Sequence, residues 1–246
     1  MRMAPCIPCA ACPIRRLPAF VGMSAEEVEF MERFKSGELR VDSGTTVLME
    51  GSNSPQLFTV LSGMGLRHKL LENGRRQVVN FVLPGDFIGL QAGLLGEMKH
   101  TVEAVTPMAL CVFSRADLWQ VFRTQPERAY DLTWIAAVEE HFLGETVATL
   151  GQRDATQRIA WALSKLYARL ISLGLGKGGG VPLPYRQQDL ADALGLSLVH
   201  TNKTLKRLGD RQLVQWREGR LRIPDPAALA EVALTEAGPP APRPLM

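Results

Sequence analysis

The segment Gln187–Leu205, which reads QQDLADALGLSLVHTNKTL, constrains the fold more than any other part of the 246-residue chain. Ala191 is small enough to let two helices cross closely, and Gly195, four residues later, can form the turn between them. Ser197 is a favourable N-cap for the second helix. The apolar seam between the two helices is expected at Leu190, Leu194, Leu198 and Leu205. The segment therefore predicts a helix-turn-helix.

The second of these helices would present a polar and basic face, with its first turn placed to reach base edges in a DNA groove. The candidate DNA-binding residues on and before this helix are Ser197, Val199, His200, Asn202, Lys203, Lys206 and Arg207. A hairpin is expected next, because Leu213–Trp216 and Arg220–Ile223 flank Arg217-Glu218-Gly219. Arg217 and Arg220 in this basic wing are expected to contact DNA phosphates. An ordinary helical hairpin is the alternative, and the wing argues against it.

The charge of the chain is divided unevenly along the sequence. Residues 151–246 hold 14 Lys and Arg against 8 Asp and Glu, a balance of +6, whereas residues 1–150 hold 14 against 17, a balance of −3. The basic half is therefore the part expected to bind a polyanion. A solvated basic surface without a partner is the alternative explanation.

Short apolar runs separated by glycines occupy the region from Phe34 to Phe113. Such spacing is typical of a small all-β sandwich or barrel. The runs are Thr46–Met49, Gln56–Leu61, Gly65–Leu71, Gln77–Leu83, Phe87–Leu90 and Ala109–Phe113. Asn73 and Gly74, between two of these runs, are both able to take a positive φ and favour a tight hairpin.

A helical period begins after Ser114 and continues in a long run, Pro126–Leu150. Its apolar residues recur every three or four positions and form one stripe, at Leu132, Ile135, Val138 and Phe142. The stripe could pack on the barrel of its own chain or on the same stripe of a second chain. We predict the second arrangement, a dimer through this helix. Asp154 and Gln157 then form a candidate capping box for a helix that continues to about Leu173.

The chain has four cysteines, and three of them, Cys6, Cys9 and Cys12, stand in a Cys-x2-Cys-x2-Cys pattern followed by Pro13. This spacing lets one loop present several thiolates to an iron–sulfur cluster. Cys111 is the fourth candidate ligand. A zinc site with four thiolates and a set of free thiols are the alternatives.

Together, the glycine-rich β-segment, the long helix and the motif DLADALGLS followed by TLKRL resemble the Crp/Fnr superfamily from Cys6 to about Pro226. The resemblance implies a homodimer that is joined along the long helix, binds a two-fold symmetric operator in double-stranded DNA and contacts RNA polymerase. The base-reading positions of the family fall on Val199, Asn202 and Lys203, where the family commonly has Glu, Ser or Gly, and Arg. The family's usual operator sequence is therefore not expected.

Cys111 resembles the distant cluster ligand of the Fnr oxygen sensors, because AVTPMALCVFSRADL places it near the end of the barrel. The resemblance implies a [4Fe-4S] cluster on Cys6, Cys9, Cys12 and Cys111, whose destruction by oxygen weakens the dimer and its DNA binding. Fnr proteins usually have a longer gap before the third N-terminal cysteine, a departure that leaves the role of Cys12 open. A regulator of this family without a cluster, sensing another small molecule or a redox signal, is the alternative.

Cyclic AMP is not expected to be the ligand. Members of the family that bind it carry an Arg-Ser pair for the cyclic phosphate, and Met98-Lys99 stands about there in this chain. A phosphate without an Arg or a helix N-terminus to meet it binds poorly.

The chain is not expected to be an enzyme, because it has no P-loop, dinucleotide fingerprint, nucleophile elbow or His-Glu-x-x-His motif. A barrel that acts only through protein partners is a third class of function.

No run of about 18 apolar residues is present, so no membrane span is expected. Prolines and cysteines interrupt the first residues where a signal peptide would be apolar, so we expect a cytoplasmic protein.

We therefore expect an α+β chain with a cyclic-nucleotide-binding-type β-roll, a long dimerisation helix and a winged helix-turn-helix. The expected segments are a cysteine-rich segment at 1–20, the sensory β-roll at 21–125, the dimerisation helix at 126–150, the DNA-binding domain at 151–230 and a disordered tail at 231–246.

Overall fold

The structure is a computed structural model that describes residues 2–3 and 6–246, and it divides into two compact units. The first unit contains the described residues up to Arg75 together with Val79–Glu139 and Pro242–Met246. The second contains Arg76–Val78 and Glu140–Ala241. Within the described residues, no helix is both long enough and apolar enough to span a membrane.

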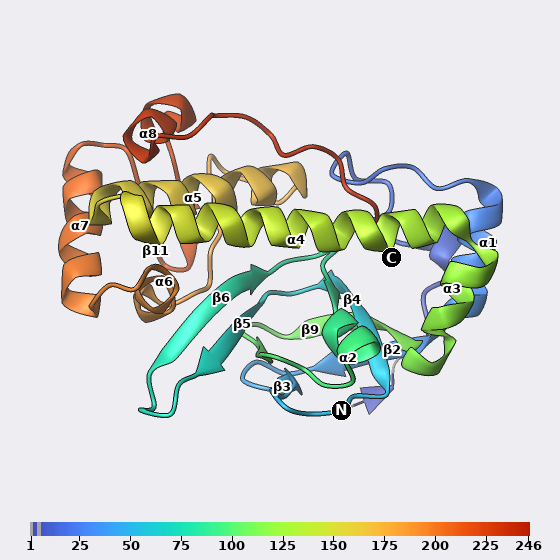
Figure 1. The fold of residues 1–246 in the computed structure, drawn as a ribbon. Coiled ribbons are helices and arrows are strands. Elements are labelled where there is room, and N and C mark those ends of the chain that lie inside the picture. Colours follow the sequence, from blue (N-terminus) through green and yellow to red (C-terminus); the bar gives the residue numbers. More distant parts are fainter. Residues whose placement is uncertain (1, 4–5) are drawn as a thin grey trace. The chain divides into compact units, whose positions relative to one another are not determined.

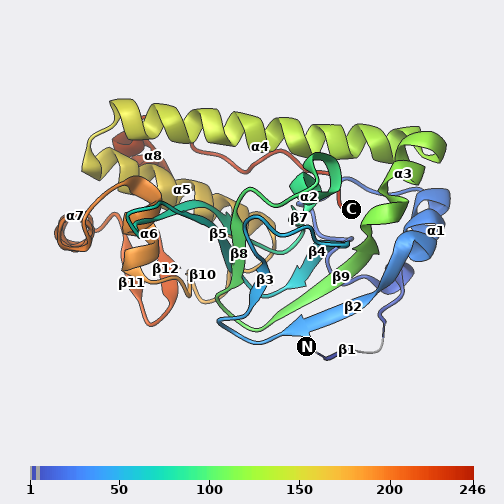
Figure 2. The same ribbon diagram turned by 60° about the horizontal axis from the view of Figure 1, so that its bottom comes forward.

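A β-roll of two sheets forms the body of the first unit (Figures 1 and 2). One sheet has the strand order β1-β2-β9-β4-β7, and the other has the order β3-β8-β5-β6. The strands are β1 (Arg2–Met3), β2 (Lys35–Val41), β3 (Thr46–Leu48), β4 (Gln56–Ser62), β5 (Gly65–Leu70), β6 (Arg76–Val82), β7 (Phe87–Ile88), β8 (Thr101–Ala104) and β9 (Met108–Ser114). All six apolar runs in the sequence therefore correspond to strands.

The core of the roll lies between the two sheets. In the five-stranded sheet, β9 pairs antiparallel with β2 on one side and with β4 on the other. Alternate residues of these strands, such as Leu110, Leu39 and Val60, point into the core and are at most 5% exposed. The opposite face of the same sheet carries Glu38, Cys111 and Thr59, which are also buried. Because both faces are buried, polar side chains on the outer face need partners from other segments.

Short helices surround the roll: the 3-10 helices η1 (Cys9–Ala11) and η2 (Arg115–Asp117), and α1 (Ala25–Phe34), α2 (Leu90–Leu95) and α3 (Leu118–Thr124). Ser24 and Glu27 form a capping box that begins α1, a signal that our sequence analysis missed. At the predicted turn between β5 and β6, Gly74 has a positive φ (+75°) and Asn73 does not. Here the N–H of Gly74 bonds to Leu71 O, and Leu71 N–H bonds to Arg75 O, which makes a longer connection.

The long helix α4 (Pro126–Gln152) matches its predicted range and contributes residues to both units. The predicted dimer stripe, however, is not one exposed surface. Leu132 and Ile135 are 1% and 4% exposed in the single chain, so they are not free to face a second copy. Phe142 stacks on Trp161 of the second unit, at 5.9 Å between ring centroids. Only Val138 of the predicted stripe is exposed.

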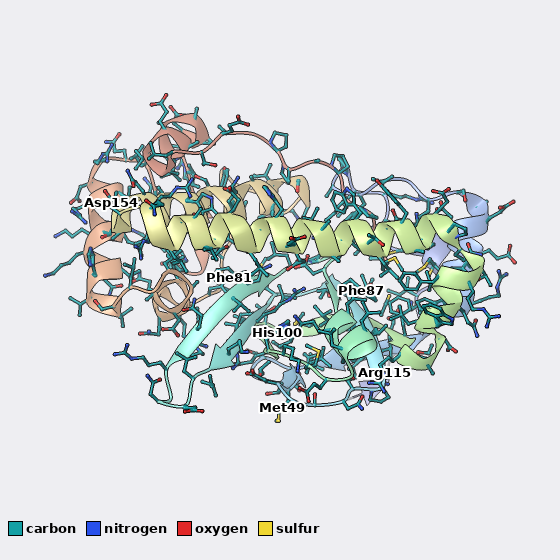
Figure 3. All side chains as sticks on the ribbon, in the orientation of Figure 1. Met49, Phe81, Phe87, His100, Arg115 and Asp154 are labelled. Carbon is teal, nitrogen blue, oxygen red and sulfur yellow. The ribbon has the colours of Figure 1, made fainter. Side chains whose placement is uncertain are left out.

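The second unit contains the C-terminal helices and a three-stranded sheet. Its elements are α5 (Ala155–Ser172), β10 (Val181–Pro182), α6 (Gln187–Leu194), α7 (Leu198–Asp210), β11 (Gln215–Arg217), β12 (Arg220–Arg222) and α8 (Pro226–Ala233). Asp154, labelled in Figure 3, begins α5 and accepts bonds from Thr156 N and Gln157 N, as the predicted capping box requires.

The prediction of a disordered tail at 231–246 is contradicted at both of its ends. α8 runs from Pro226 to Ala233, so the predicted boundary at residue 230 falls inside a helix. The last five residues, Pro242–Met246, belong to the first unit, and three of them are buried. A segment with several prolines does not form a helix, but as an extended segment it can still dock on a surface.

Gly63 and Gly74 allow a matched test of the roll. Both have a positive φ, which costs an L-residue about 1–2 kcal/mol. A Cβ on Gly63 would lie 2.2 Å from Pro107 O, whereas a Cβ on Gly74 would meet nothing within 4 Å. We expect Gly74→Ala to lower the free energy of unfolding by about 1–2 kcal/mol and Gly63→Ala to lower it clearly more, as measured by urea denaturation. Equal losses would contradict the close approach at Gly63.

Candidate DNA-binding surface and cysteine site

The turn between α6 and α7 has the geometry that the sequence predicts. Gly195 has φ +64° and ends α6, with its N–H bonded to Ala191 O. A Cβ at Gly195 would meet nothing within 4 Å, so glycine is needed there for its backbone conformation and not for space. The Ser197 hydroxyl accepts a bond of 3.2 Å from His200 N and caps α7.

The buried face of α7 differs from the predicted seam at one position. Leu190, Leu194 and Leu205 are buried as expected, but Leu198 is 39% exposed. The packed residues of α7 are instead Thr201, Thr204, Leu205 and Leu208, which follow the three-to-four-residue period from the first turn onward. Leu198 is in phase with this stripe, but as the first residue of the helix it stays partly exposed.

All of the candidate DNA-binding residues are exposed. On α7 and its cap these are Ser197, Val199, His200, Asn202, Lys203, Lys206 and Arg207, and in the wing they are Arg217 and Arg220. Arg207 also donates a bond of 3.0 Å to the Thr204 hydroxyl. One face of α7 therefore combines short polar groups near its start with basic groups further along, a combination that suits base edges and phosphates.

The predicted wing is a two-stranded hairpin of β11 and β12. Glu218 and Gly219 have φ of +50° and +69°, the conformation of a tight hairpin turn. The Arg220 guanidinium bonds to Gly180 O at 3.0 Å and to Lys177 O, so it holds the wing against the loop before β10. The Trp216 indole N–H donates to Leu183 O at 3.1 Å and anchors the other strand. Arg217 and Arg222 are exposed on the same hairpin.

The cysteine segment is held on the outer face of the five-stranded sheet by one buried ion pair. The Lys35 ammonium lies 2.7 Å from Glu38 Oε1, and the two side chains are 2% and 1% exposed. Lys35 also donates to Ile7 O, and Ile7 N donates to Glu38, each at 2.7 Å. This pair was not predicted, because nothing in the sequence marks Lys35 and Glu38 as buried.

Two further side chains fix the loop that carries the first cysteines. The Arg15 guanidinium donates to Cys9 O and to Ala10 O, each at 3.1 Å. Cys9 N donates to the Glu32 carboxylate on α1. The loop between Ile7 and Cys12 is therefore ordered by contacts to α1 and β2.

Cys111 lies in the middle of β9, between Glu38 on β2 and Thr59 on β4. It is 7% exposed and points to the outer face, where the cysteine segment lies. Cys9 and Cys12 are close enough to Cys111 to influence its ionisation, and Lys35 is close to Cys6, Cys9 and Cys111. The structure thus brings the predicted ligands into one region around Lys35.

Burial keeps two of these thiols protonated at neutral pH. Burial, followed by the nearby Glu32 carboxylate, raises the pKa of Cys9 to about 11. Burial also raises the pKa of Cys111 to about 12, although the Lys35 ammonium opposes the rise. Burial alone would lower the pKa of Lys35, but the hydrogen bond to Glu38, the thiols of Cys111 and Cys6 and the charge of Glu38 together outweigh it and raise the pKa, so Lys35 stays charged.

The thiols do not surround a single point. Within residues 2–3 and 6–246, no three His, Cys, Asp or Glu side chains converge closely enough to hold one metal ion. Cys6 is exposed, Cys9 and Cys12 are half-buried, and Cys111 is buried.

At the place where cyclic-nucleotide binders have their phosphate-binding pair, Met98 is 1% exposed and Lys99 pairs with Glu97.

Comparison with known proteins adds sequence evidence to this geometry. A model of the cyclic nucleotide-binding domain matches residues 38–125, and a model of the Crp-like helix-turn-helix domain matches residues 157–232. The nitrogen fixation regulation protein FixK of Bradyrhizobium diazoefficiens is 30% identical over 225 residues, which cover 92% of this chain and 93% of that protein. FixK of Rhizobium meliloti is 32% identical over 189 residues, covering 76% and 82% of the two chains.

The fold is also similar to a solved structure, that of FixK2 from Bradyrhizobium japonicum. The TM-score is 0.72 at 23% identity, over 82% of this chain and 98% of that one. A β-roll, a long helix and a winged helix-turn-helix thus occur in the same order in both. With two domain models and a relative of 30% identity along nearly its whole length, the chain belongs to the Crp/Fnr family of DNA-binding transcription regulators.

Proposed function

We propose that this chain acts as a dimer that binds a two-fold symmetric operator and contacts RNA polymerase. We also propose that Cys6, Cys9, Cys12 and Cys111 bind an oxygen-sensitive [4Fe-4S] cluster, which controls the DNA binding. The observation that carries the DNA-binding part is the exposed polar and basic face of α7 beside a basic wing. Regulators of the family bind DNA and act as dimers, which supports the same arrangement.

The residues of the surface divide into two roles. Asn202 and Lys203 lie in the first two turns of α7 and are short or flexible enough to reach base edges in a major groove. Val199 has no hydrogen-bonding group and is suited to contact a thymine methyl group. Arg217 on the wing is suited to a phosphate, which positions the protein without reading sequence.

We expect Lys203→Ala to reduce discrimination at one base pair of each half-site by roughly 1–3 kcal/mol. Arg217→Ala should instead weaken binding to all sequences and make the dependence on salt less steep, because a phosphate contact releases counterions. The DNA affinities of both variants are measured by fluorescence anisotropy, on specific and random duplexes and over a range of salt concentrations. If Lys203→Ala lost equal affinity for both duplexes, Lys203 would not be a base-reading residue.

The dimer surface of α4 must differ from the predicted stripe, because Leu132 and Ile135 are already buried in the single chain. Tyr130, Ala137 and Gly144 recur every seven residues on another face and are exposed. Small residues at the second and third positions would let two helices approach closely. We propose that this face meets the same face of a second copy.

Gly144→Glu tests that surface in the single chain's open space, because Gly144 is exposed and a Cβ there would meet nothing within 4 Å. We expect the variant to sediment as a monomer at concentrations at which the parent is a dimer, since two carboxylates would face each other without partners. Val138→Glu is the matched control: it lies about 100° around the helix from Ala137 and should leave the dimer intact. A Gly144→Glu variant that stays dimeric would refute the proposed face.

The cluster proposal rests on the donor set gathered around Lys35. Four thiols are available, and Cys9, Cys12 and Cys111 are close enough to interact electrostatically. A cluster spreads its four cysteine ligands over several iron atoms, whereas one zinc ion needs them around a single centre. The spread of the thiols therefore suits a cluster better than zinc. The positive charge of Lys35 would favour the thiolate forms that a cluster requires.

When bound, a cluster would supply an oxygen-labile link between the N-terminal segment and β9. Residues of the chain position the segment: Lys35 and Glu38 bond to the backbone of Ile7, and Arg15 bonds to the backbone of Cys9. Ligand binding by neutral thiols releases protons, so binding strengthens as the pH rises toward the raised pKa values of Cys9 and Cys111. Loss of the cluster would leave the segment without metal–thiolate bonds to β9.

Anaerobically prepared protein should therefore be brown, contain about four irons per chain, and lose its colour and its tight DNA binding in air. Reconstitution should be more complete at pH 8.5 than at pH 7, because deprotonating the buried thiols is less costly at the higher pH. Cys111→Ser should abolish iron binding, whereas Ser62→Ala, at the end of β4, should not. Colourless, iron-free protein that was prepared without oxygen and still binds its operator as a dimer would exclude the cluster.

A regulator without a cluster is the second candidate. The observation that favours it is the lack of any three convergent metal-binding side chains among the described residues. In that case the buried, protonated Cys111 would be a core residue and the exposed Cys6 would be the thiol available to an oxidant. The iron analysis of anaerobic protein separates the two candidates.

A further inference from the structure

The five residues Pro242–Met246, here called the strap, follow the second unit in sequence but pack within the first unit. In Figure 1 the chain ends at the point marked C. The Arg128 guanidinium on α4 donates to Leu245 O at 3.4 Å, and the Thr59 hydroxyl on β4 donates to Met246 O. The strap therefore contacts both a helix and the outer face of the five-stranded sheet.

The backbone of the strap pairs with the segment that follows the cysteines. Phe20 and Arg243 form a parallel bridge. Val21 N donates to Arg243 O, and Arg243 N donates to Ala19 O, each at 2.9 Å. Both polar groups of the Arg243 backbone are thus satisfied by one neighbouring segment, as they would be in a sheet.

The Arg243 side chain supplies a specific contact. Its guanidinium lies 2.6 Å from the Asp86 carboxylate, and the two side chains are 18% and 2% exposed. The other Asp86 oxygen accepts a bond of 2.9 Å from Leu83 N, so the turn before β7 fixes its orientation. A buried carboxylate needs a partner of opposite charge, and Arg243 provides it.

The remaining side chains of the strap are apolar and buried. Leu245 and Met246 are 4% and 3% exposed, and Pro244 is also buried. Met246 O lies at Thr59, which is the register partner of Cys111 on β9. The strap and the cysteine segment therefore cover neighbouring positions of the same sheet face.

We infer that the outer face of the five-stranded sheet is a binding site for the peptide Pro242–Met246, and that the docked peptide restrains the second unit, which carries the helix-turn-helix. Eight residues, 234–241, join the end of α8 to the strap. A chain of this length spans at most roughly 30 Å, so α8 stays within that distance of the sheet while the strap is docked. The second unit is then held to the first by the continuous helix α4 and also by this link, whose far end is the noncovalently docked strap.

The site can be tested with the peptide of residues 239–246, PPAPRPLM, labelled with fluorescein at its N-terminus, and a chain that ends at Ala241. We expect one peptide to bind per truncated chain, and to bind the full chain at least tenfold more weakly because its own strap fills the site. A peptide with Arg243→Glu should bind the truncated chain at least tenfold more weakly, whereas one with Pro240→Ala, outside the strap, should bind as well as the parent. Equal binding to both chains, binding to neither, or no effect of Arg243→Glu would overturn the inference.

Full-length Arg243→Glu protein provides a second test that does not depend on truncation. Hydrogen exchange at the Val21 amide, which bonds to Arg243 O, should become at least tenfold faster. The radius of gyration from X-ray scattering should increase as the link is freed. Glu236→Arg, an exposed charge reversal in the link, should change neither quantity. Unchanged exchange in Arg243→Glu would contradict docking, and an unchanged radius would contradict the restraint.

Discussion

The outer face of the five-stranded sheet imposes the constraint on which the rest of the first unit depends. Glu38, Cys111 and Thr59 stand in register across β2, β9 and β4, and all three are buried. Buried polar groups without partners are costly. Ile7 and Lys35 satisfy Glu38, and Met246 O satisfies Thr59. Segments from the two ends of the sequence therefore meet on one row of the sheet.

This arrangement connects the cysteine segment to the strap and to α4, which are distant from it in sequence. The segment of Cys9 and Cys12 is followed by Ala19–Val21, which pairs with Arg243. Arg128 on α4 contacts Leu245 O and also forms an ion pair of 2.7 Å with Glu27 on α1. The residues that follow the cysteine segment therefore contact the strap, and the strap contacts the first turns of α4. A change in the cysteine segment can reach both. Any such coupling acts in both directions.

The fold was largely predictable because its signals are local. The glycine-separated runs correspond to strands, the Asp154 capping box begins α5, and Gly195 and Ser197 mark the turn of the helix-turn-helix. Exposure on α7 was also predictable, because it follows from the helical period once the buried stripe is known. These features depend only on residues close together in sequence.

The features that escaped prediction all depend on which segment covers which surface. The periodicity of α4 predicted the stripe of Leu132 and Ile135 but not that both residues are already buried within the single chain. Lys35 and Glu38 look like surface residues in the sequence, but in the structure both are buried and bonded to Ile7 of the cysteine segment. The proline-rich end looked disordered because its binding site is built from residues more than 100 positions away, such as Asp86.

The central claim, that this chain reads DNA as a two-fold dimer through α7 and its wing, is tested most directly by selection from a pool of random duplexes. The full chain, prepared without oxygen, is mixed with the pool, and the bound sequences are determined. The account predicts enrichment of an inverted repeat whose half-sites are about 10 base pairs apart, centre to centre, or a multiple of that distance. Enrichment of a single unrepeated half-site, or no enrichment over the starting pool, would contradict it.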